Sequence, residues 1–438
     1  MKKQTIISML MCLFVMAGFA QEIDYETYEL SNGLDVILHQ DNSTPIVTVG
    51  VMYAVGGKDG EVGRSGFAHF FEHLLFEGTK NIERGEWFNI VDANGGRNNA
   101  YTTLDRTFYY ETFPSNALEL GLWMESERML HPVINQIGVD TQNEVVKEEK
   151  RTNYDNRPYG NFSVVVNQNL FDKHPYKNPN IGYMEELDAA TLEEFKAFFD
   201  KYYGPNNATL VVAGDINMGE TIKMIKDYFG PIPKGQEVEK NKIKEGPIQN
   251  KIEVTEYDSN IQIPLKVLAY RTPSVKERDA YVLDMISQVL SGGKTSRLYK
   301  RMVDDDKIAL QILAFARSME DYGTYIIGAL PLGDNSLENL TAVMDEEIEK
   351  IKTELISEKE YEKLQNTFEN RFVSSNSSIE GIARSLATYH SLYGDVSLIN
   401  NEIDIYKSIT REEIMEVANK YLQEDRRLEL DYLPENEK

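Results

Sequence analysis

Two histidines and a glutamate stand in a segment that is otherwise almost entirely apolar. His69, Glu72 and His73 lie within residues 66–76, whose other members are mainly Phe and Leu. Residues four apart share one face of a helix, so the two imidazoles can converge on one ion. Glu72 directly precedes His73, close enough to act on water at the metal without being a ligand. Burying unpaired polar groups costs roughly 2–7 kcal/mol each, and a divalent metal is the simplest partner.

The order of these residues points to zinc. His-x-x-Glu-His is the reverse of the His-Glu-x-x-His motif of zinc hydrolases, and it favours a metal site over core histidines that are satisfied by other contacts. Catalytic zinc usually has three protein ligands and a water, so a third ligand is required. The remaining candidate histidines lack motif support and are interpreted as structural: His39, His131, His174 and His390.

Carboxylates are better candidates for the third ligand. Residues 143–154 form a highly charged, helix-like segment that contains Glu144, Glu148 and Glu149. The residues alone leave these three alternatives open.

The N-terminus has the pattern of a secretory signal peptide. Lys2 and Lys3 precede an apolar run, and small residues offer a cleavage point after Ala20. The run is short for a membrane anchor, which needs about 20 residues. Cys12, the only cysteine, lies inside it, so we expect a mature chain without thiols, without a membrane span, and exported, most simply to a bacterial periplasm.

The charge of the chain argues against polyanionic partners. The formal net charge is −25, and removing Lys2 and Lys3 makes it −27. Such an acidic chain is a poor binder of nucleic acid.

The elements that position the motif occur twice. The segment that starts at Thr191 resembles the one that starts at Thr410, displaced by 219 residues, and each opens with a Thr-x-x-Glu capping box. Each is followed by a short strand, at 208–213 and 427–432, and each half begins with a strand that leads into an apolar helix. This repetition predicts an α+β fold of two homologous domains from internal duplication, each a mainly antiparallel sheet packed by helices on one side. We expect a signal peptide at 1–20, a zinc-bearing domain at 21–233, a linker at 234–250 and a homologous domain at 251–438.

The second half lacks the metal-binding residues. Aligning the two apolar helices places Leu283, Ile286 and Ser287 over His69, Glu72 and His73. We therefore expect one zinc ion per chain, with the second half shaping a cavity.

Several segments together resemble one known family. These are the His-x-x-Glu-His motif with the Leu-Leu-Phe-Glu-Gly-Thr that follows, Gly-Gly-Arg-Asn-Asn-Ala-Tyr-Thr at 95–102, Val-Val-Lys-Glu-Glu at 145–149 and Asn-Arg-Pro-Tyr-Gly at 156–160. They resemble the pitrilysin/insulinase family of zinc peptidases, which includes the mitochondrial processing peptidases and bacterial relatives. The short members of that family have two homologous α+β domains.

The resemblance implies a role for each site residue. Glu149 matches the family's third zinc ligand, with Glu148 one residue away as the alternative. Gln142 stands where the family often has a glutamate that supports the metal site. Glu72 is the implied general base of peptide hydrolysis, and Asn99, Ala100 and Tyr101 match an edge strand to which unfolded peptides add through main-chain hydrogen bonds.

One family feature is missing. Active single-chain members carry an Arg and, seven residues on, a Tyr in the second domain, and these positions hold Val303 and Leu310 here. Arg297 and Arg301 are near but out of register and are interpreted as surface residues. This implies the zinc subunit of a heterodimer whose homologous partner supplies the Arg/Tyr pair. The alternatives are a self-sufficient homodimeric peptidase and a non-enzymatic scaffold or peptide-binding subunit of the same fold.

Overall fold

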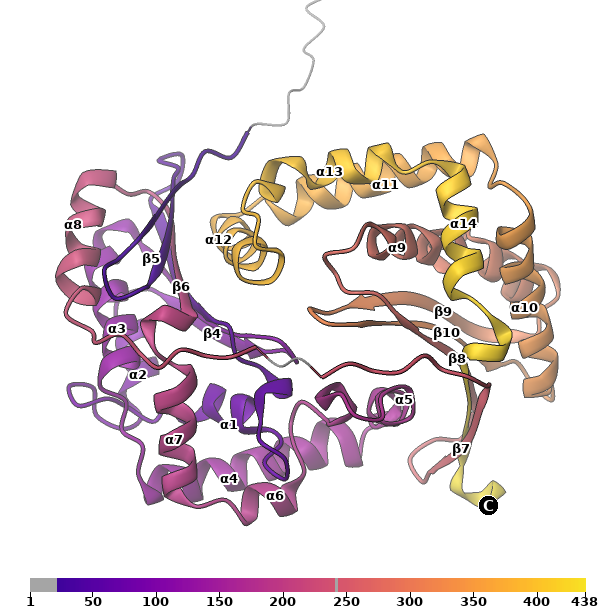
Figure 1. The fold of residues 1–438 in the computed structure, drawn as a ribbon, viewed down its shortest axis with the longest axis horizontal. Helices are drawn as coiled ribbons and strands as arrows, with labels where there is room; N and C mark the ends of the chain where they lie inside the picture. Colours follow the sequence, from indigo (N-terminus) through magenta and orange to yellow (C-terminus); the bar gives the residue numbers. More distant parts are fainter. Residues whose placement is uncertain (1–21, 241–242) are drawn as a thin grey trace, which may run out of the picture.

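The computed structural model describes residues 22–240 and 243–438, and each half of the chain builds one sheet (Figure 1). The expected signal peptide at 1–20, with Cys12, lies outside the described residues. The first sheet has the order β1-β2-β6-β3-β5-β4. Its strands are β1 (Glu26–Glu29), β2 (Asp35–Gln40), β3 (Ile46–Tyr53), β4 (Arg97–Thr102), β5 (Thr107–Pro114) and β6 (Ala208–Gly214).

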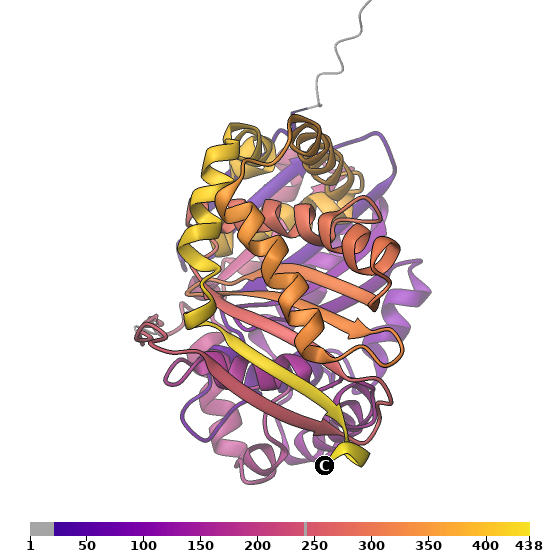
Figure 2. The same ribbon diagram turned by 90° about the vertical axis from the view of Figure 1, so that its right-hand side faces the viewer.

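The second sheet repeats this topology. Its order is β7-β11-β8-β10-β9, which matches the first sheet without β1. Its strands are β7 (Ile252–Asp258), β8 (Leu265–Thr272), β9 (Ala309–Ser318), β10 (Gly323–Pro331) and β11 (Leu428–Pro434). In each sheet one pair is parallel, β2 with β6 and β7 with β11, and all other pairs are antiparallel. Figure 2 shows the β7–β11 pair at the outer edge. The expected fold, two α+β domains with mainly antiparallel sheets, is confirmed.

Most helices of each half cover one face of the sheet of that half. The helices of the first half are α1 (Phe67–Leu74), α2 (Glu86–Ala93), α3 (Leu118–Leu130), α4 (Gln136–Lys150), α5 (Phe162–Leu170), α6 (Met184–Asp188), α7 (Leu192–Tyr202) and α8 (Met218–Phe229). Those of the second half are α9 (Arg278–Ser291), α10 (Leu337–Thr353), α11 (Glu358–Ser375), α12 (Ile379–Thr388), α13 (Leu398–Ser408) and α14 (Arg411–Tyr421). The two capping boxes form as the sequence predicts, because Thr191 opens α7 and Thr410 opens α14, each accepting from the backbone of a glutamate three residues on.

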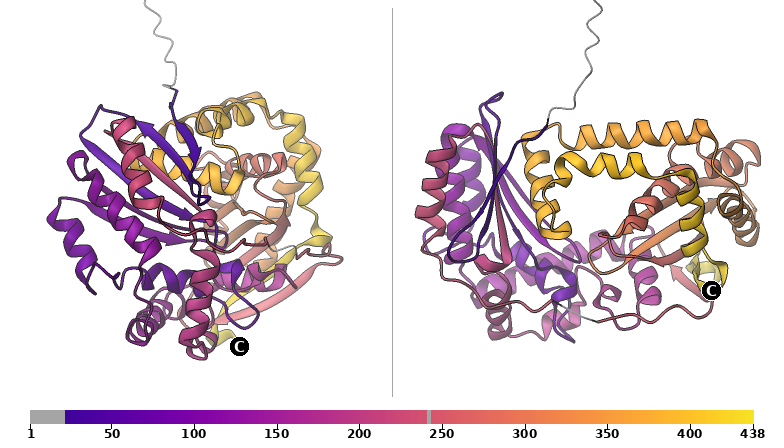
Figure 3. Two further views of the ribbon diagram at one scale, coloured as in Figure 1. Left: turned by 60° about the vertical axis from the view of Figure 1, so that its left-hand side comes forward. Right: turned by 45° about the horizontal axis from the view of Figure 1, so that its top comes forward.

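The two halves exchange a helix. α12, from the second half, packs on β3 and β6 of the first sheet, where Ile382 and Leu386 join the apolar residues of those strands. α5, from the first half, packs on β8 and β11 of the second sheet through Val166 and Leu170. Each sheet is therefore covered by its own helices on one face and by a helix of the other half on the opposite face (Figure 1; Figure 3).

A charged cluster joins the tips of two hairpins. Lys58 Nζ lies 3.0 Å from Asp105 in the β4–β5 turn, and 2.8 and 2.9 Å from Glu320 and Asp321 in the β9–β10 turn. Because Lys58 is almost fully buried, these contacts are shielded from water and fix one hairpin against the other. Residues 233–240 and 243–249, which connect the halves, form neither helix nor strand.

Candidate metal centre

The histidines are positioned by the apolar face of α1. Phe67, Phe70 and Phe71 stack on aromatic rings of α7, with Phe67 4.6 Å and Phe70 4.7 Å from Phe195 between ring centroids. Gly66 precedes the helix at φ +82°, and a Cβ there would lie 2.6 Å from the Cα of Gly182, so only glycine fits this close approach. With the phenylalanines directed into the core, the remaining helix face carries His69 and His73.

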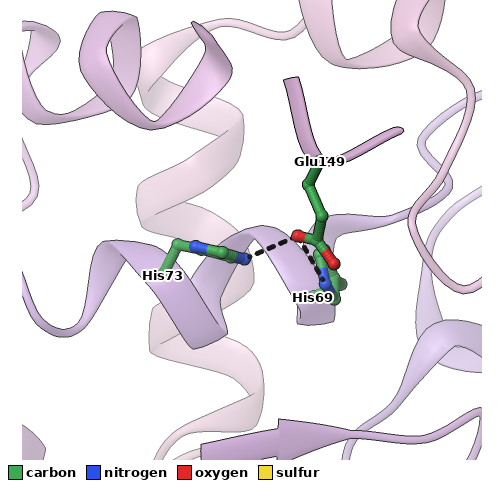
Figure 4. A group of neighbouring side chains, drawn as sticks. All are labelled: His69, His73 and Glu149. Atoms are coloured by element: carbon green, nitrogen blue, oxygen red, sulfur yellow. Dashed lines mark ion pairs between the residues drawn. The ribbon is translucent and has the colours of Figure 1, made fainter. Parts of the chain in front are cut away.

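The third side chain comes from α4, which packs against α1. α4 starts at Asn135, whose side chain accepts from Gly138 N, and its last turn leads into a wider helical turn at Arg151–Asp155. Glu149 extends from this end of the helix toward both imidazoles (Figure 4).

The distances suit a tetrahedral ion. Glu149 Oε2 lies 3.2 Å from His73 Nε2 and 3.5 Å from His69 Nε2. Zinc ligands about 2.0–2.2 Å from the metal stand about 3.4 Å apart at the corners of a tetrahedron. The side chains of His69, His73 and Glu149 are 10%, 25% and 30% exposed, so a fourth ligand can approach from solvent.

The donor atoms fit a cation. Glu149 Oε2 and His69 Nδ1 are buried and have no hydrogen-bond partner among the described residues. The nearby His69, and then His73, hold the pKa of the Glu149 carboxyl well below its usual value. An ionised carboxylate facing two imidazole nitrogens is a ligand set that zinc prefers. In the described residues this is the sole cluster of three or more candidate metal ligands.

The other acids that the sequence left open point elsewhere. Glu148 is 66% exposed and pairs with Arg151 at 2.5 Å. Glu144 is 71% exposed and pairs with Lys147 at 3.2 Å. The structure thus brings Glu149, and neither of these two, to the histidines.

Glu72 lies beside two buried tyrosines. Burial raises the pKa of Tyr109 and of Tyr203 well above the usual value, and the nearby Glu72 carboxyl contributes to both shifts. The Tyr109 hydroxyl also donates to the carbonyl oxygen of Phe71 at 2.8 Å. Glu72 is partly exposed, so it retains access to water.

Among the described residues, Gln142 forms no hydrogen bond with His69 or His73. Its Nε2 donates to Glu77 Oε1 at 2.5 Å, and Glu77 also forms an ion pair with Arg84. Gln142 therefore connects α4 to the segment that follows α1. Its effect on the metal centre is indirect, through the relative position of the two helices.

Asn99, Ala100 and Tyr101 lie on β4, the edge strand of the first sheet, and β4 also contacts α1. The Ala100 N–H bonds to the side chain of Asn99 at 2.9 Å, a contact that a main-chain partner could replace. The side chain of Asn99 is exposed, and that of Tyr101 is partly buried. The strand thus has the position that main-chain addition of a peptide requires.

The second half offers no ligands at the corresponding place. Leu283, Ile286 and Ser287 are buried in α9. Val303 lies in the helical turn Tyr299–Asp305 and Leu310 at the start of β9, 51% exposed. The two arginines near these positions in the sequence have acidic partners: Arg297 pairs with Glu360 at 2.7 Å, and Arg301 pairs with Asp306.

The remaining histidines have separate partners. His39 contacts the Asp24 carbonyl oxygen, His131 contacts Glu127, His174 contacts Asp321, and His390 contacts Thr209. Two other residues near the metal centre were not singled out from the sequence. Tyr154 follows Glu149 in the helical turn, and Arg317 comes from β9 in the other half; no local motif marks either.

Comparisons with known proteins agree with this architecture. The family model of Insulinase (Peptidase family M16) matches residues 35–182, and that of the Peptidase M16 inactive domain matches residues 189–368. The zinc protease PqqE of Helicobacter pylori is 28% identical over 403 residues, which cover 91% of this chain and 90% of that protein.

Comparison with solved structures also finds proteins of the same architecture. A protease from Helicobacter pylori superimposes with a TM-score of 0.89 at 27% identity, covering 94% of this chain and all of the other. The first half of the periplasmic protease PqqL from Escherichia coli has a TM-score of 0.76 at 20% identity, covering 93% and 92%; this second likeness concerns the fold. No helix in the described part of the chain is long and apolar enough to cross a membrane.

Proposed function

Because the chain belongs to the pitrilysin/insulinase (M16) family of zinc peptidases, we propose that it is a zinc metallopeptidase that hydrolyses unfolded peptides. The observation that carries this proposal is the convergence of His69, His73 and Glu149. They would hold one zinc ion per chain. Zinc in such a site polarises the scissile carbonyl and lowers the pKa of its water toward about 7.

The residues of the chain supply the proton transfer and the binding of the substrate. Glu72 accepts the proton of the attacking water and later returns it to the leaving amine. The peptide adds to the free edge of β4 at Asn99, Ala100 and Tyr101, so that its main chain is held without strong selection for sequence. Gln142 supports the metal centre by holding α4 against the segment after α1.

The Glu72→Gln variant tests this mechanism. The amide keeps the size of the side chain but accepts no proton at neutral pH, so the variant should retain zinc and lose peptide cleavage by at least about 100-fold. Zinc content is measured on the same preparation as cleavage of an unfolded peptide. Cleavage by Glu72→Gln at the parent rate would show that Glu72 is not the base. A parent protein that binds no zinc would favour the alternative, a non-enzymatic scaffold or peptide-binding subunit.

We further propose that the chain works as the zinc subunit of a heterodimer. Residues 21–233 would form the zinc-bearing domain and 251–438 the homologous domain, joined by a linker at 234–250. Val303 and Leu310 have no hydrogen-bond donors in their side chains, so a homologous partner would supply the Arg/Tyr pair. Peptide cleavage by the purified chain, with and without such a partner, tests this. If the purified chain is fully active without a partner, and its native mass is that of a dimer, the self-sufficient homodimer would be favoured.

The location follows from the N-terminal sequence. Residues 1–20 would direct export, most simply to a periplasm, and be removed. N-terminal sequencing of the purified protein tests this. A first residue of Gln21 would support the proposal, and a protein in the cytoplasmic fraction that still begins at Met1 would contradict it.

A further inference from the structure

Arg317 belongs to the β9–β10 hairpin of the second half, which meets the β4–β5 turn where Glu320 N donates to Asp105 Oδ2 at 3.1 Å. Arg317 lies on β9, opposite Thr324 of β10. Residues two or four positions apart on a strand face the same side of the sheet. Leu313, four residues before Arg317, packs against the apolar cluster under α5. Arg317 therefore stands on the face of the second sheet that is turned toward α5.

Tyr154 is near both Arg317 and Glu149, since both charges act on it. Burial raises the pKa of Tyr154, the Glu149 carboxylate adds to this rise, and the Arg317 guanidinium opposes it. Both charges therefore act on one phenol. Since Tyr154 also stands five residues after Glu149 in one continuous helical segment, Arg317 is a basic group of the second half in the region of the proposed zinc site.

The guanidinium of Arg317 has no ion-pair partner within residues 22–240 and 243–438. The acid that acts on it, Asp105, is already satisfied. Asp105 Oδ1 contacts Lys58 Nζ at 3.0 Å and accepts from the Tyr176 hydroxyl, and Oδ2 accepts from Glu320 N at 3.1 Å.

Two other basic residues of this region, Lys58 and Arg271, already have ion-pair partners. Lys58 contacts three carboxylates, and Arg271 bonds to the Leu170 carbonyl and to Glu245. Arg317 is exposed to solvent. A guanidinium remains charged at any ordinary pH and carries five N–H donors, so Arg317 can offer paired hydrogen bonds to an anion.

On these grounds we propose that Arg317 binds a carboxylate of the peptide substrate next to the scissile bond, with the Tyr154 hydroxyl as a second donor. Guanidinium and carboxylate form paired, charge-assisted hydrogen bonds, and a chain with a net charge of −25 otherwise repels acidic peptides. The inference deepens the proposed peptidase function and rests on it for the position of the substrate. Arg317 is here a specificity-determining residue that acts on binding, and it takes no part in proton transfer.

The carboxylate can come from an acidic side chain or from the free C-terminus of the peptide. Three sets of otherwise identical peptides distinguish these sources: Glu against Gln on the acyl side, Glu against Gln on the leaving side, and a free against an amidated C-terminus. They are compared in the zinc-loaded parent, in Arg317→Gln, in Arg317→Lys and in Arg426→Gln. Arg426 is a matched control because it is 63% exposed and, among the charged groups of the described residues, contacts only Asp425, at 3.9 Å.

The parent should prefer the carboxylate in one of the three sets by about 10- to 100-fold in kcat/KM, the range expected for a hydrogen bond between charged groups. Arg317→Gln should abolish the preference, mainly through KM, with little change for the neutral peptide. Arg317→Lys should keep part of it, and Arg426→Gln all of it. An equal preference in the parent and Arg317→Gln, or none in the parent, would overturn the proposal. So would an equal loss for charged and neutral peptides, which is the mark of a structural role.

A binding measurement separates this inference from the proposed function. Anisotropy of the same peptides, fluorescently labelled, is recorded with zinc-loaded Glu72→Gln and with the double variant Glu72→Gln, Arg317→Gln. If the parent cleaves nothing but binding of the carboxylate peptide still depends on Arg317, the peptidase proposal fails and this inference stands. If cleavage is confirmed and binding ignores the carboxylate, the inference fails alone.

Discussion

The hydroxyl of Tyr109 donates to the carbonyl oxygen of Phe71, 2.8 Å away, and so ties strand β5 to the helix of His69 and His73. The same ring lies 4.4 Å from the buried guanidinium of Arg128, which in turn donates to the Leu75 carbonyl at 3.1 Å. The metal-binding helix is thus fixed at its centre and at its C-terminal end by polar contacts inside an otherwise apolar core.

Removing the Tyr109 hydroxyl should have a modest effect. In Tyr109→Phe the Phe71 oxygen still accepts from Leu75 N at 3.0 Å, so no buried acceptor is left unpaired. We expect the free energy of unfolding to fall by about 0.5–1.5 kcal/mol, measured by urea denaturation, with zinc content unchanged. Loss of zinc from Tyr109→Phe would mean that this bond also sets the geometry of the metal ligands.

Zinc binding should distinguish two neighbouring glutamates. Glu149→Gln removes the ionised oxygen that faces His69 and His73, whereas Glu148→Gln changes an exposed residue paired with Arg151. Zinc at 100 times its Kd should stabilise the parent and Glu148→Gln by about 2.7 kcal/mol. The rise in Tm on adding zinc to the chelated protein should be nearly lost in Glu149→Gln. A loss in Glu148→Gln instead would assign the third ligand to Glu148.

The buried cluster around Arg128 should tolerate loss of one acid but not of the base. Arg128 lies 3.0 Å from Glu111 and 3.1 Å from Glu125, and all three are fully buried. Burial, and then the neighbouring Glu125, raise the pKa of Glu111 well above its usual value, which favours the neutral form of this carboxyl. Glu111→Gln should therefore change stability by less than about 1 kcal/mol, while Arg128→Met should cost about 3–5 kcal/mol. Similar losses in the two variants would show that Glu111 is ionised.

The stability of the protein should depend on pH through Asp59. Burial raises the pKa of this carboxyl to about 7, against the opposing effect of Lys58. Between about pH 4 and pH 7 the folded state keeps a proton that the unfolded state releases, so this contribution to stability declines as the pH rises through that window. Asp59→Asn removes the decline and retains an oxygen for the Gly56 N–H, which lies 2.8 Å from Asp59 Oδ2.

Urea unfolding at pH 5, 6, 7 and 8 checks this. Relative to the parent, Asp59→Asn should gain stability up to pH 7, by at most about 1.4 kcal/mol per pH unit, and then level off. Asp334→Asn, a change of an exposed residue, should run parallel to the parent. A constant difference between the parent and Asp59→Asn would contradict the raised pKa.

The exchanged helices should couple the stability of the two halves. Leu386 of α12 and Leu170 of α5 are buried against the sheet of the opposite half. Each change to Ala should cost about 2–5 kcal/mol, and Leu386→Ala should lower amide protection in β3 and β6, over 160 residues away in the sequence. Leu355→Ala, at a position 39% exposed, should cost about 0.5 kcal/mol or less. Unchanged protection in β3 and β6 would mean that α12 does not support the first sheet.

The sequence by itself determined the elements with a strong local or repeated signal. The four-residue spacing of His69 and His73 places both on one helix face whatever the rest of the chain does. The capping boxes at Thr191 and Thr410 act within four residues, and their displacement by 219 residues revealed the duplication that the two matching sheets confirm. These features depend on contacts between near neighbours, which the order of residues specifies directly.

The tertiary structure alone decided which long-range contacts form. Glu148 and Glu149 differ by about 100° in direction around α4, so the rotation of α4 against α1 selects Glu149 for the histidines, and that rotation is set by packing. The exchange of α5 and α12 has the same origin, since an apolar helix face can cover either sheet and only chain path and shape choose between them. Arg317 comes near Tyr154 for the same reason, because two hairpins far apart in the sequence meet at the Lys58 cluster.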